Sequence, residues 1–318
     1  MFYQGKRVLV TGGAGFVGTH LVKALVEAGA QVRATTHEKA PAFHHPSVTY
    51  VPADLLKAED CARICEGMDL VFLCAANTSG AAVMERTPLV HLTPNVVMNA
   101  QMLEASYGAG VSKVLFISSN TVYPVSDAPM KEADVTNTFF SKYHVVAWMK
   151  RFTEIMCDMY STRIGRPMPC VVVRPANAYG PHDKFDPAKS HVLPALIRKV
   201  VDRPDPLPVW GDGMDLKDFI YIEDLVEGLL LAMEKLDGTQ PVNLASGQGY
   251  RLRDLLQTLL DLDGFQDARI AYDTTQPTMI PVRLIDPTLA RELLGFEART
   301  PIEEGLRRTL AWYRAQLA

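Results

Sequence analysis

The sequence predicts an α/β fold, a doubly wound parallel sheet with a second, smaller C-terminal lobe. Three observations lead to this prediction. Strand-like apolar runs alternate with amphipathic helical runs through the first half of the chain. A glycine-rich turn joins the first strand to the first helix. The chain has 318 residues, 48% of them hydrophobic, which is enough for one large core and one small one.

The composition excludes several classes of protein. A formal net charge of −4, with both signs mixed along the chain, provides no basic stripe for nucleic acid, and no apolar run is long enough to span a membrane. The first strand begins within a few residues of Met1, so we expect no signal peptide. The 5 cysteines and 8 histidines show no metal-ligand spacing. We therefore expect a cytoplasmic protein with buried thiols and without a metal, nucleic-acid or membrane partner.

The most informative stretch is the first strand and the glycine turn after it. Residues 8–11 are apolar and strand-like, and Gly12, Gly15 and Gly18 follow at the spacing of a dinucleotide-binding turn. Gly12 allows a sharp turn, Gly15 removes a side chain that would keep a pyrophosphate from the helix N-terminus, and Gly18 lets the helix approach the sheet. Because an amphipathic helix follows at residues 19–29, we predict a dinucleotide site here.

Strands and helices are expected to continue in alternation after this turn. Further strands are predicted at residues 31–37, 48–51, 70–75, 113–118 and 170–174. Helices are predicted between them, with long ones at residues 95–108 and 141–162. Residues 218–235 are expected to return to the sheet as a strand and a helix, and residues 241–245 as its last strand. Such alternation gives a parallel sheet that helices cover on both faces.

The composition of the sequence changes after residue 180, and this change predicts where the smaller lobe begins. Prolines become frequent and the predicted elements become short. We assign residues 1–180 plus 218–245 to the dinucleotide-binding domain and residues 181–217 plus 246–318 to the smaller lobe. The cleft between the two lobes is the expected substrate site.

Four motifs occur in a fixed order along the chain. They are TGGAGFVG at residues 11–18, SSNTVY at 118–123, RPANAYGP at 174–181 and SHVLPAL at 190–196. Together they resemble the extended short-chain dehydrogenase/reductases, more narrowly the nucleotide-sugar epimerases, dehydratases and GDP-fucose synthase. The resemblance covers nearly the whole chain. It implies a Rossmann fold, an NAD(P) cofactor, a nucleotide-diphosphate sugar as substrate and a smaller lobe that binds this sugar nucleotide.

The resemblance implies cofactor contacts at the carboxyl ends of the first strands. Asp54 matches the acid that meets the adenine, and Ala75 and Ala76 match small residues beside the cofactor. The cofactor-binding residues expected from the motifs are Gly12, Gly15, Phe16, Val17, Gly18, Thr36, His37, Asp54, Leu55, Ala75, Ala76 and Lys150.

The choice between NAD and NADP depends on the end of the second strand. An NAD enzyme usually has an acid there, which binds the ribose hydroxyls. Thr36 occupies that position, and His37 and Lys39 follow it, which favours NADP slightly. Glu38 weakens this preference.

The resemblance also implies a catalytic serine, tyrosine and lysine, with the tyrosine four residues before the lysine on one helix. Ser119 is the serine, because it lies four residues before the tyrosine of SSNTVY. No tyrosine in the sequence has a lysine four residues later. If Lys142 were the lysine, Thr138 would replace the tyrosine. We favour Lys150, which Glu154 follows four residues later as in the family, and which places Val146 at the tyrosine position.

Valine cannot transfer a proton, and four explanations remain open. Tyr143 lies seven residues before Lys150, on nearly the same helix face, and could substitute after a shift, although a packing or interface role is the simpler expectation. His191 matches a histidine that serves epimerisation in GDP-fucose synthase, with Thr121 in place of its partner cysteine, or else His191 caps a helix. The third explanation is lost catalysis with retained binding, and the fourth is an engineered substitution.

Four residues are expected to bind substrate. Asn177 belongs to RPANAYGP, and Trp210 either stacks on a nucleobase or packs in the core. Lys217 stands where the family has a diphosphate-binding arginine, which keeps the charge but loses the bidentate fork. Arg283 matches a second diphosphate contact. The alternative for Lys217 and Arg283 is a pair of solvated surface cations.

The sequence therefore predicts an NAD(P)-dependent nucleotide-sugar epimerase that acts by transient oxidation of the sugar. The enzymatic alternatives are an epimerase/reductase like GDP-fucose synthase and a nucleotide-sugar dehydratase. The alternative of a different class is a degenerate protein that senses NAD(P) or a nucleotide sugar. The helices at residues 95–108 and 141–162 resemble those of the family's dimeric four-helix bundle, which implies a homodimer.

Overall fold

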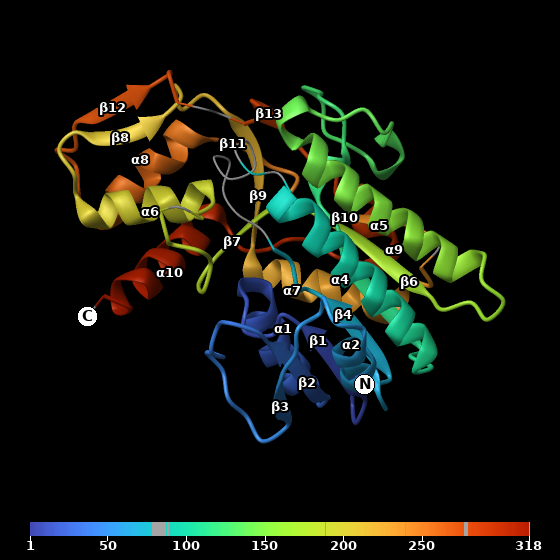
Figure 1. Cartoon of the computed structure of the whole chain (residues 1–318). Helices are drawn as coiled ribbons and strands as arrows, with labels where there is room; N and C mark the ends of the chain where they lie inside the picture. The colour runs from blue at the N-terminus through green and yellow to red at the C-terminus, as the bar shows by residue number, and fades with distance from the viewer. Residues whose placement is uncertain (78–86, 88, 188, 239, 277–278, 318) are drawn as a thin grey trace.

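The computed structural model describes residues 1–77, 87, 89–187, 189–238, 240–276 and 279–317. Its centre is a parallel sheet of seven strands in the order β10-β6-β5-β4-β1-β2-β3 (Figure 1). These strands are β1 (Arg7–Thr11), β2 (Gln31–Thr36), β3 (Val48–Pro52), β4 (Leu70–Leu73), β5 (Lys113–Ile117), β6 (Cys170–Pro175) and β10 (Val242–Leu244). The six strands predicted up to residue 174 and the strand predicted at residues 241–245 all lie in this sheet. Their predicted ends differ from the observed ones by one or two residues.

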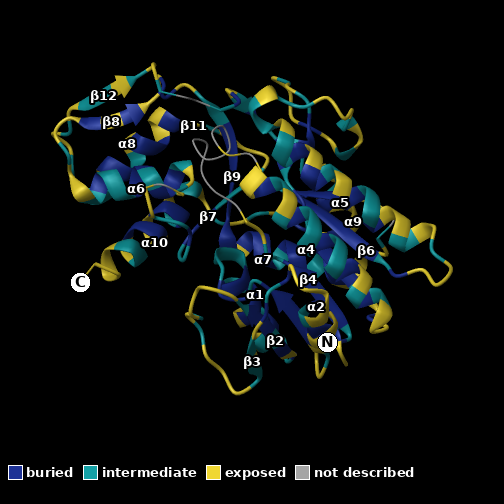
Figure 2. Ribbon diagram, in the orientation of Figure 1, coloured by how far each residue is buried: buried dark blue, intermediate teal, exposed yellow. Residues whose placement is uncertain are grey.

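Helices cover both faces of this sheet because its strands are apolar on both sides. Val8 and Val10 of β1 face one core, and Leu9 between them faces the other. Helices α1 (Phe16–Glu27) and α7 (Ile222–Lys235) pack together over the first core. The helices of the second core are α2 (Ala58–Cys65), α4 (Leu89–Gly108) and α5 (His144–Thr162). Figure 2 shows the central strands between these layers as buried, whereas the edge strand β3 is partly exposed.

Helix α4 begins earlier than the sequence predicts. We expected its start at Asn95, directly after Pro94, but the helix begins at Leu89 and contains the proline. Proline has no N–H to donate to the carbonyl of Val90, four residues before it. The amide Nδ2 of Asn77 donates to that carbonyl instead, at 3.2 Å. The side chain of Asn77, which lies far from the helix in sequence, therefore compensates for the lost helical bond.

The expectation that a strand at residue 218 returns to the main sheet is also wrong. Strand β9 (Leu216–Tyr221) lies in a second, smaller sheet between β11 (Gly249–Arg251) and β13 (Val282–Arg283), and β7 (Asn177–Tyr179) pairs with β9 as well. Only the following helix, α7, returns to the main sheet. The local pattern of residues predicts a strand but does not specify which sheet it joins.

The remaining elements surround this second sheet. Strands β8 (Leu207–Trp210) and β12 (Ile270–Asp273) form a two-stranded sheet. The helices in this part of the chain are α6 (Val192–Asp202), α8 (Leu252–Asp263), α9 (Thr288–Leu294) and α10 (Ile302–Ala315), of which α9 packs against α7. Short helices η1 (Asn120–Val122), η2 (Glu132–Asp134) and η3 (Ser141–Tyr143) lie between β5 and α5. Within the described residues, no helix is both long and apolar enough to cross a bilayer.

Candidate active site

The glycine turn after β1 is shaped to receive an anion at the start of α1. Gly12 has a φ of +66°, and a Cβ there would lie 2.9 Å from the Cα of Ala75. A Cβ at Gly18 would overlap with the carbonyl of Gly12. Gly15 is the residue before α1, and no side chain caps the helix there. The first N–H groups of α1, from Phe16 onward, are thus directed at a site that fits the pyrophosphate of a dinucleotide.

Two threonines that the sequence reading missed hold this turn in place. The Oγ1 of Thr35 accepts the N–H of Gly12 at 2.8 Å. The Oγ1 of Thr11 accepts the N–H groups of Cys74 and Ala75 at 3.0 and 3.1 Å. Thr11 therefore brings the segment with Ala75 and Ala76 next to the glycine turn. A threonine at the end of each strand was the available signal in the sequence.

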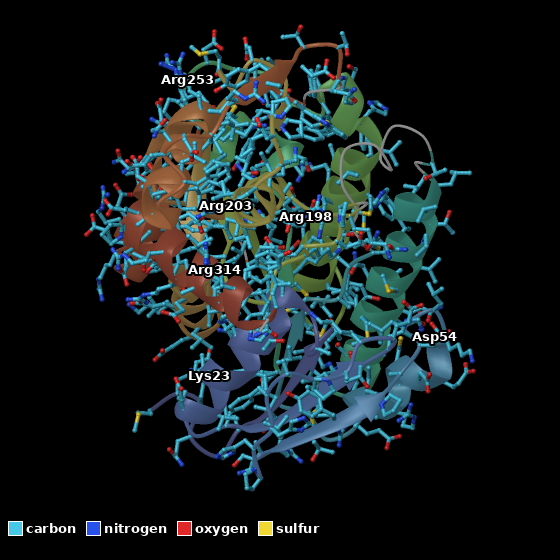
Figure 3. The ribbon with its side chains drawn as sticks, turned by 90° about the vertical axis from the view of Figure 1, so that its left-hand side faces the viewer. Lys23, Asp54, Arg198, Arg203, Arg253 and Arg314 are labelled. Carbon is cyan, nitrogen blue, oxygen red and sulfur yellow. The ribbon has the colours of Figure 1, made fainter. Side chains whose placement is uncertain are left out.

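The carboxyl ends of β2 and β3 bring together the residues expected to bind the adenine end of the cofactor. The N–H of Ala53 donates to the carbonyl of Thr36 at 3.0 Å. Asp54 and Leu55 follow directly, with Leu55 buried and Asp54 partly exposed. His37 is exposed next to Thr36. Figure 3 shows Asp54 beside the blue N-terminal strands, far from Arg253 in the smaller lobe.

Ser119 and Thr121 lie together directly after β5. The Oγ of Ser119 accepts a bond from the N–H of Thr121 at 3.2 Å and from its hydroxyl at 3.0 Å. The Nδ2 of Asn120 donates to the carbonyl of Pro175 at 3.1 Å, which fixes this turn to the end of β6. Ser119 thus lies at the edge of the sheet where the glycine turn also lies.

Lys150 of α5 reaches the same edge. Its Nζ donates to the carbonyl of Ile117 at 2.7 Å, two residues before Ser119, and lies 4.8 Å from the centre of the Phe116 ring. Burial lowers the pKa of this ammonium to about 8, and the nearby carboxylate of Glu154 opposes this shift. Val146 lies one turn earlier on the same helix, half-buried.

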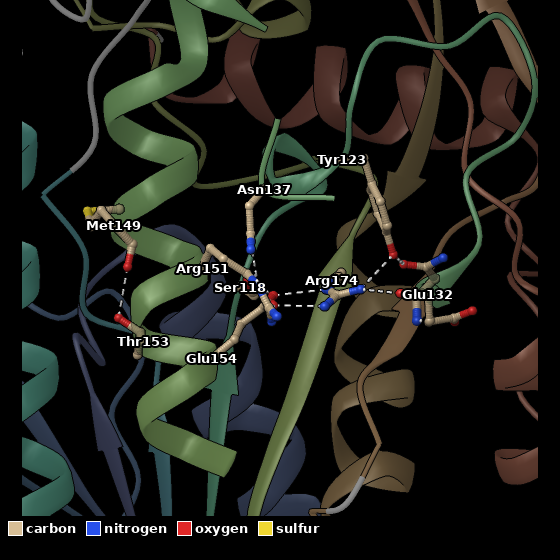
Figure 4. Close-up of polar contacts among 10 residues, drawn as sticks. Ser118, Tyr123, Glu132, Asn137, Met149, Arg151, Thr153, Glu154 and Arg174 are labelled. Atoms are coloured by element: carbon tan, nitrogen blue, oxygen red, sulfur yellow. Dashed lines mark hydrogen bonds and ion pairs between the residues drawn. The ribbon is translucent and has the colours of Figure 1, made fainter. Parts of the chain in front are cut away.

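Glu154 is the centre of a buried polar network beneath the site (Figure 4). Its carboxylate accepts the hydroxyl of Ser118 at 2.5 Å and two bonds from Arg174 at 2.8 and 2.9 Å. Arg151 donates a further bond at 3.1 Å. The glutamate four residues after Lys150 therefore anchors helix α5 to β5 and β6. Its pairing with the first residue of RPANAYGP was not predicted from the sequence.

The network continues through Tyr123 to the last strand of the sheet. Arg174 donates to the Oη of Tyr123 at 3.2 Å, and this hydroxyl donates to Asn243 of β10 at 2.6 Å. Burial raises the pKa of Tyr123 to about 12, so the phenol stays a neutral donor. The last residue of the SSNTVY motif is thereby bonded to a strand that lies 120 residues later in the sequence.

Lys217 and Arg283 are neighbours on β9 and β13 of the smaller sheet. Both side chains are buried, which contradicts the alternative of solvated surface cations. The Nζ of Lys217 lies 3.0 Å from the carboxylate of Asp215. Arg283 donates to the carbonyls of Tyr123 and Pro124 at 3.2 and 2.9 Å. Its Nε is buried and has no hydrogen-bond partner among the described residues.

Tyr143 is the last residue of η3, directly before helix α5, and lies close to Arg283. Burial is the main cause that raises its pKa to about 12, while Arg283 and a hydrogen bond with the backbone of Ile280 act in the other direction. The hydroxyl of Tyr143 therefore has a partner in the smaller lobe and is a weak acid near neutral pH.

The other two predicted substrate residues, Asn177 and Trp210, lie on β7 and β8. The Nδ2 of Asn177 donates to the carbonyl of Asp218 at 2.8 Å and so links β7 to β9. Trp210 ends β8 with 47% of its surface exposed, so it is not a core residue. His191 precedes α6, but its side chain does not cap that helix. Its Nδ1 lies 3.1 Å from the Oδ1 of Asp183 instead.

Comparisons with known proteins agree with this arrangement. Residues 8–245 match the family described as NAD dependent epimerase/dehydratase family. The chain is 28% identical over 321 residues to probable GDP-L-fucose synthase 1 of Oryza sativa subsp. japonica, which covers 98% of this chain and 92% of that protein.

Two solved structures are similar over their whole length. UDP-glucose 4-epimerase of Thermotoga maritima, with UDP-glucose, is 27% identical with a TM-score of 0.88, covering 98% of this chain and 100% of that one. MoeE5 in complex with UDP-glucose and NAD is 27% identical with a TM-score of 0.83, again covering 98% and 100%.

Proposed function

Because the chain belongs to the NAD dependent epimerase/dehydratase family, we propose that it is a nucleotide-sugar epimerase that oxidises its sugar transiently. One observation carries this proposal. Lys150 is fixed by the carbonyl of Ile117 beside Ser119, at the sheet edge that also holds the glycine turn. A dinucleotide on that turn and a sugar hydroxyl at Ser119 would meet at this edge.

The other site residues have roles that follow from their places in the fold. The ammonium of Lys150 binds the ribose next to the nicotinamide, and the hydroxyls of Ser119 and Thr121 orient the reacting sugar hydroxyl. Lys217 and Arg283 offer two adjacent cations to the diphosphate. Trp210 and Asn177 complete the substrate contacts in the smaller lobe.

The proton must move without the family's tyrosine. A bound nicotinamide supplies reversible acceptance of a hydride. Val146 has no proton to exchange, and the hydroxyl of Tyr143 is held in the smaller lobe with a raised pKa. We assign the proton to His191, whose imidazole is 46% exposed and is oriented by a carboxylate.

The second candidate is an epimerase/reductase like GDP-fucose synthase. It is favoured by the similarity to the rice protein over 98% of this chain, together with the SHVLPAL motif that contains His191. In this reaction the same histidine would exchange a proton on a carbon next to a keto group.

We propose NADP as the preferred cofactor, with NAD as the alternative. Thr36 ends β2 without a carboxylate, and exposed His37 and Lys39 follow it. A 2′-phosphate would be attracted to these cations, although Glu38 lies between them. The bound NAD of MoeE5 supports the alternative. Dissociation constants for NADPH and NADH, measured by fluorescence, discriminate between the two.

We also propose that the protein is a homodimer of the cytoplasm. Helix α5 exposes three large apolar side chains, Trp148, Phe152 and Met159, which would pack on a second copy. All 5 cysteines are free thiols, which suits a reducing compartment.

A turnover screen tests the proposed function. The protein is reconstituted with NAD or NADP and incubated with UDP-, GDP-, CDP- and dTDP-sugars, and the products are separated by chromatography and mass spectrometry. The Val146→Tyr variant is tested in parallel. Turnover by the unaltered protein supports the proposal and a mechanism without the tyrosine. If only Val146→Tyr turns over a nucleotide sugar, the substrate is identified, but the proposal that the unaltered protein is active is overturned. Tight nucleotide binding without turnover by either protein favours the sensor.

A further inference from the structure

Asp183 and His191 form a pair whose proton position is fixed by geometry. The Oδ1 of Asp183 accepts the N–H of Lys184 at 2.7 Å and lies 3.1 Å from the Nδ1 of His191. Oδ1 belongs to a carboxylate and carries no proton. It therefore accepts the hydrogen bond from His191 as well as the one from the backbone N–H of Lys184. The ring therefore donates through Nδ1–H, which leaves Nε2 with a free lone pair when the imidazole is neutral.

The carboxylate of Asp183 is buried at a cost in stability. The side chain has no exposed surface, and its Oδ2 has no hydrogen-bond partner among the described residues. Burying a charged oxygen that has no hydrogen-bond donor costs more free energy than a single hydrogen bond contributes. The ammonium of Lys184 also lies near enough to interact electrostatically with this carboxylate. Orientation of the exposed ring of His191 accounts for a carboxylate in this place.

The loop that carries Asp183 is held from two sides. Gly180 must be glycine, because a Cβ there would overlap with Ile222, and His182 follows with a φ of +68°. The Nε2 of His20, on helix α1, lies 2.9 Å from the carbonyl of Pro181. The ring of His182 lies between His20 and Trp312 of α10, with centroid distances of 5.6 and 4.9 Å.

These contacts place the loop against helix α1. Helix α1 begins at the glycine turn, and His20 lies about one turn after its start. The Asp183 loop therefore packs against the helix that would hold the dinucleotide, and Figure 1 shows this loop between α1 and α10. His191 follows at the start of α6, on the side of the smaller lobe.

We propose that Asp183 is the positioning residue that makes Nε2 of His191 the acid–base atom of the enzyme. This inference rests on the proposed function. A bound nicotinamide would accept the electron pair of the sugar C–H bond as hydride. The part of this chain is the proton: as the hydroxyl O–H bond breaks and the C=O bond forms, Nε2 of His191 takes the proton. The carboxylate of Asp183 stabilises the imidazolium. Return of the hydride to the opposite face of the carbonyl carbon, and of the proton from Nε2 to the oxygen, gives the epimer and restores both groups.

Histidine nitrogen NMR and kinetics on the same variants test this role. Histidines are labelled with ¹⁵N, and His191→Asn identifies the His191 signals. Asp183→Ala removes the acceptor, whereas Asp183→Asn retains an oxygen acceptor and removes the charge. Asp263→Ala is the matched control, because Asp263 is also a buried carboxylate of the smaller lobe, paired with Arg203 and Arg314 (labelled in Figure 3).

The expected result is a change of tautomer together with a change in kcat. Wild type and Asp183→Asn show the Nδ1–H form, and Asp183→Ala shows the Nε2–H form. In Asp183→Ala kcat falls about 10- to 100-fold and KM changes less than about threefold, and Asp183→Asn falls between this variant and wild type. Asp263→Ala lowers the unfolding temperature but leaves the tautomer and kcat unchanged.

Three results would overturn the proposal. The pair is absent if the tautomer of His191 is the same in wild type and Asp183→Ala. The pair is merely structural if the tautomer changes while kcat does not. A wild-type protein that turns over no nucleotide sugar overturns the proposed function as well, which separates that failure from the other two.

Discussion

Lys150 is a buried cation whose hydrogen bond goes to a neutral carbonyl. Because burial lowers its pKa to about 8, the ammonium loses its proton as the pH rises through that value. The role proposed for Lys150, binding of the cofactor ribose, requires the charged form. We therefore expect the dissociation constant of the dinucleotide to be constant below about pH 7 and to rise up to about tenfold per pH unit above pH 8.

Fluorescence titrations of NADPH between pH 6.5 and 9.5 measure this dependence. Lys150→Met is expected to bind weakly at every pH. Lys142→Met is the matched control, because Lys142 is the lysine of the other register and lies in η3, and it should bind like wild type. Weak binding by Lys142→Met, with normal binding by Lys150→Met, would show that Lys142 and not Lys150 is the lysine that binds the cofactor.

Asp218 is a buried carboxyl whose titration contributes to stability. Burial raises its pKa to about 7 from an ordinary value near 3.8, although Ser246 and Gly247 donate three hydrogen bonds to it. Between these values the unfolded chain releases the proton and the folded protein keeps it. The contribution is therefore complete below about pH 4 and is lost as the pH rises through 7.

Urea unfolding of wild type and Asp218→Asn at pH 5, 6, 7 and 8 measures this contribution. Relative to the variant, wild type should lose on the order of 1 kcal/mol per pH unit up to about pH 7 and little above it. Parallel stability curves for the two proteins would show that Asp218 does not titrate in this range.

Single residues differ in how far the sequence predicts their roles. The glycines and Ser119 are proposed from short motifs, whose residues lie within a few positions of one another. Lys150 lacks the tyrosine of its motif, so the sequence left Lys142 as an alternative. Glu154 and Arg174 pair across 20 residues, and Tyr123 and Asn243 across 120. Such partners are brought together only by the folded sheet, so no local pattern predicts them.

Among the elements, the buried strands are predicted best because an apolar run bounded by turns has few alternatives. Helix α4 shows the opposite case. It begins at Leu89 and contains Pro94 in its second turn, whereas a proline is expected to mark the first turn of a helix. The bond from Asn77 to Val90 that permits the longer helix is a tertiary contact.

Helix α5 exposes three large apolar side chains, on which the proposed homodimer depends. Trp148, Phe152 and Met159 are 37%, 45% and 48% exposed. We expect wild type to elute with about twice the mass of the 35.1 kDa chain in size-exclusion chromatography with light scattering, and Phe152→Glu to elute as a monomer. Leu293→Glu, at a similarly exposed leucine of α9, should remain dimeric. A dimer that survives Phe152→Glu would place the interface elsewhere.

On the scale of the whole molecule, Arg283 joins the smaller sheet to the segment that follows β5. It lies on β13 of the smaller sheet and donates to two carbonyls just after the Ser119 turn. Arg283→Met removes both bonds and leaves buried carbonyls unpaired, so we expect a loss of about 2–4 kcal/mol of unfolding free energy and a raised KM. Lys217→Met should raise KM with a smaller loss of stability. Denaturant unfolding and steady-state kinetics on both variants measure these effects. Equal stability losses would contradict the bridging role of Arg283.

The bond between Tyr123 and Asn243 also determines when the site can form during synthesis. Strands β1 to β5 pair with neighbours made within the first 117 residues, so this half of the sheet can close as the chain leaves the ribosome. The segment after Ser119 has no such local partner. The turn at Asn120 can attach to Pro175 once β6 has been made, but the hydroxyl of Tyr123 lacks its acceptor until β10 has been translated and has joined the edge of the sheet. A chain that stalls on the ribosome before residue 243 therefore has its glycine turn and the first anchor of the Ser119 turn, but not the second.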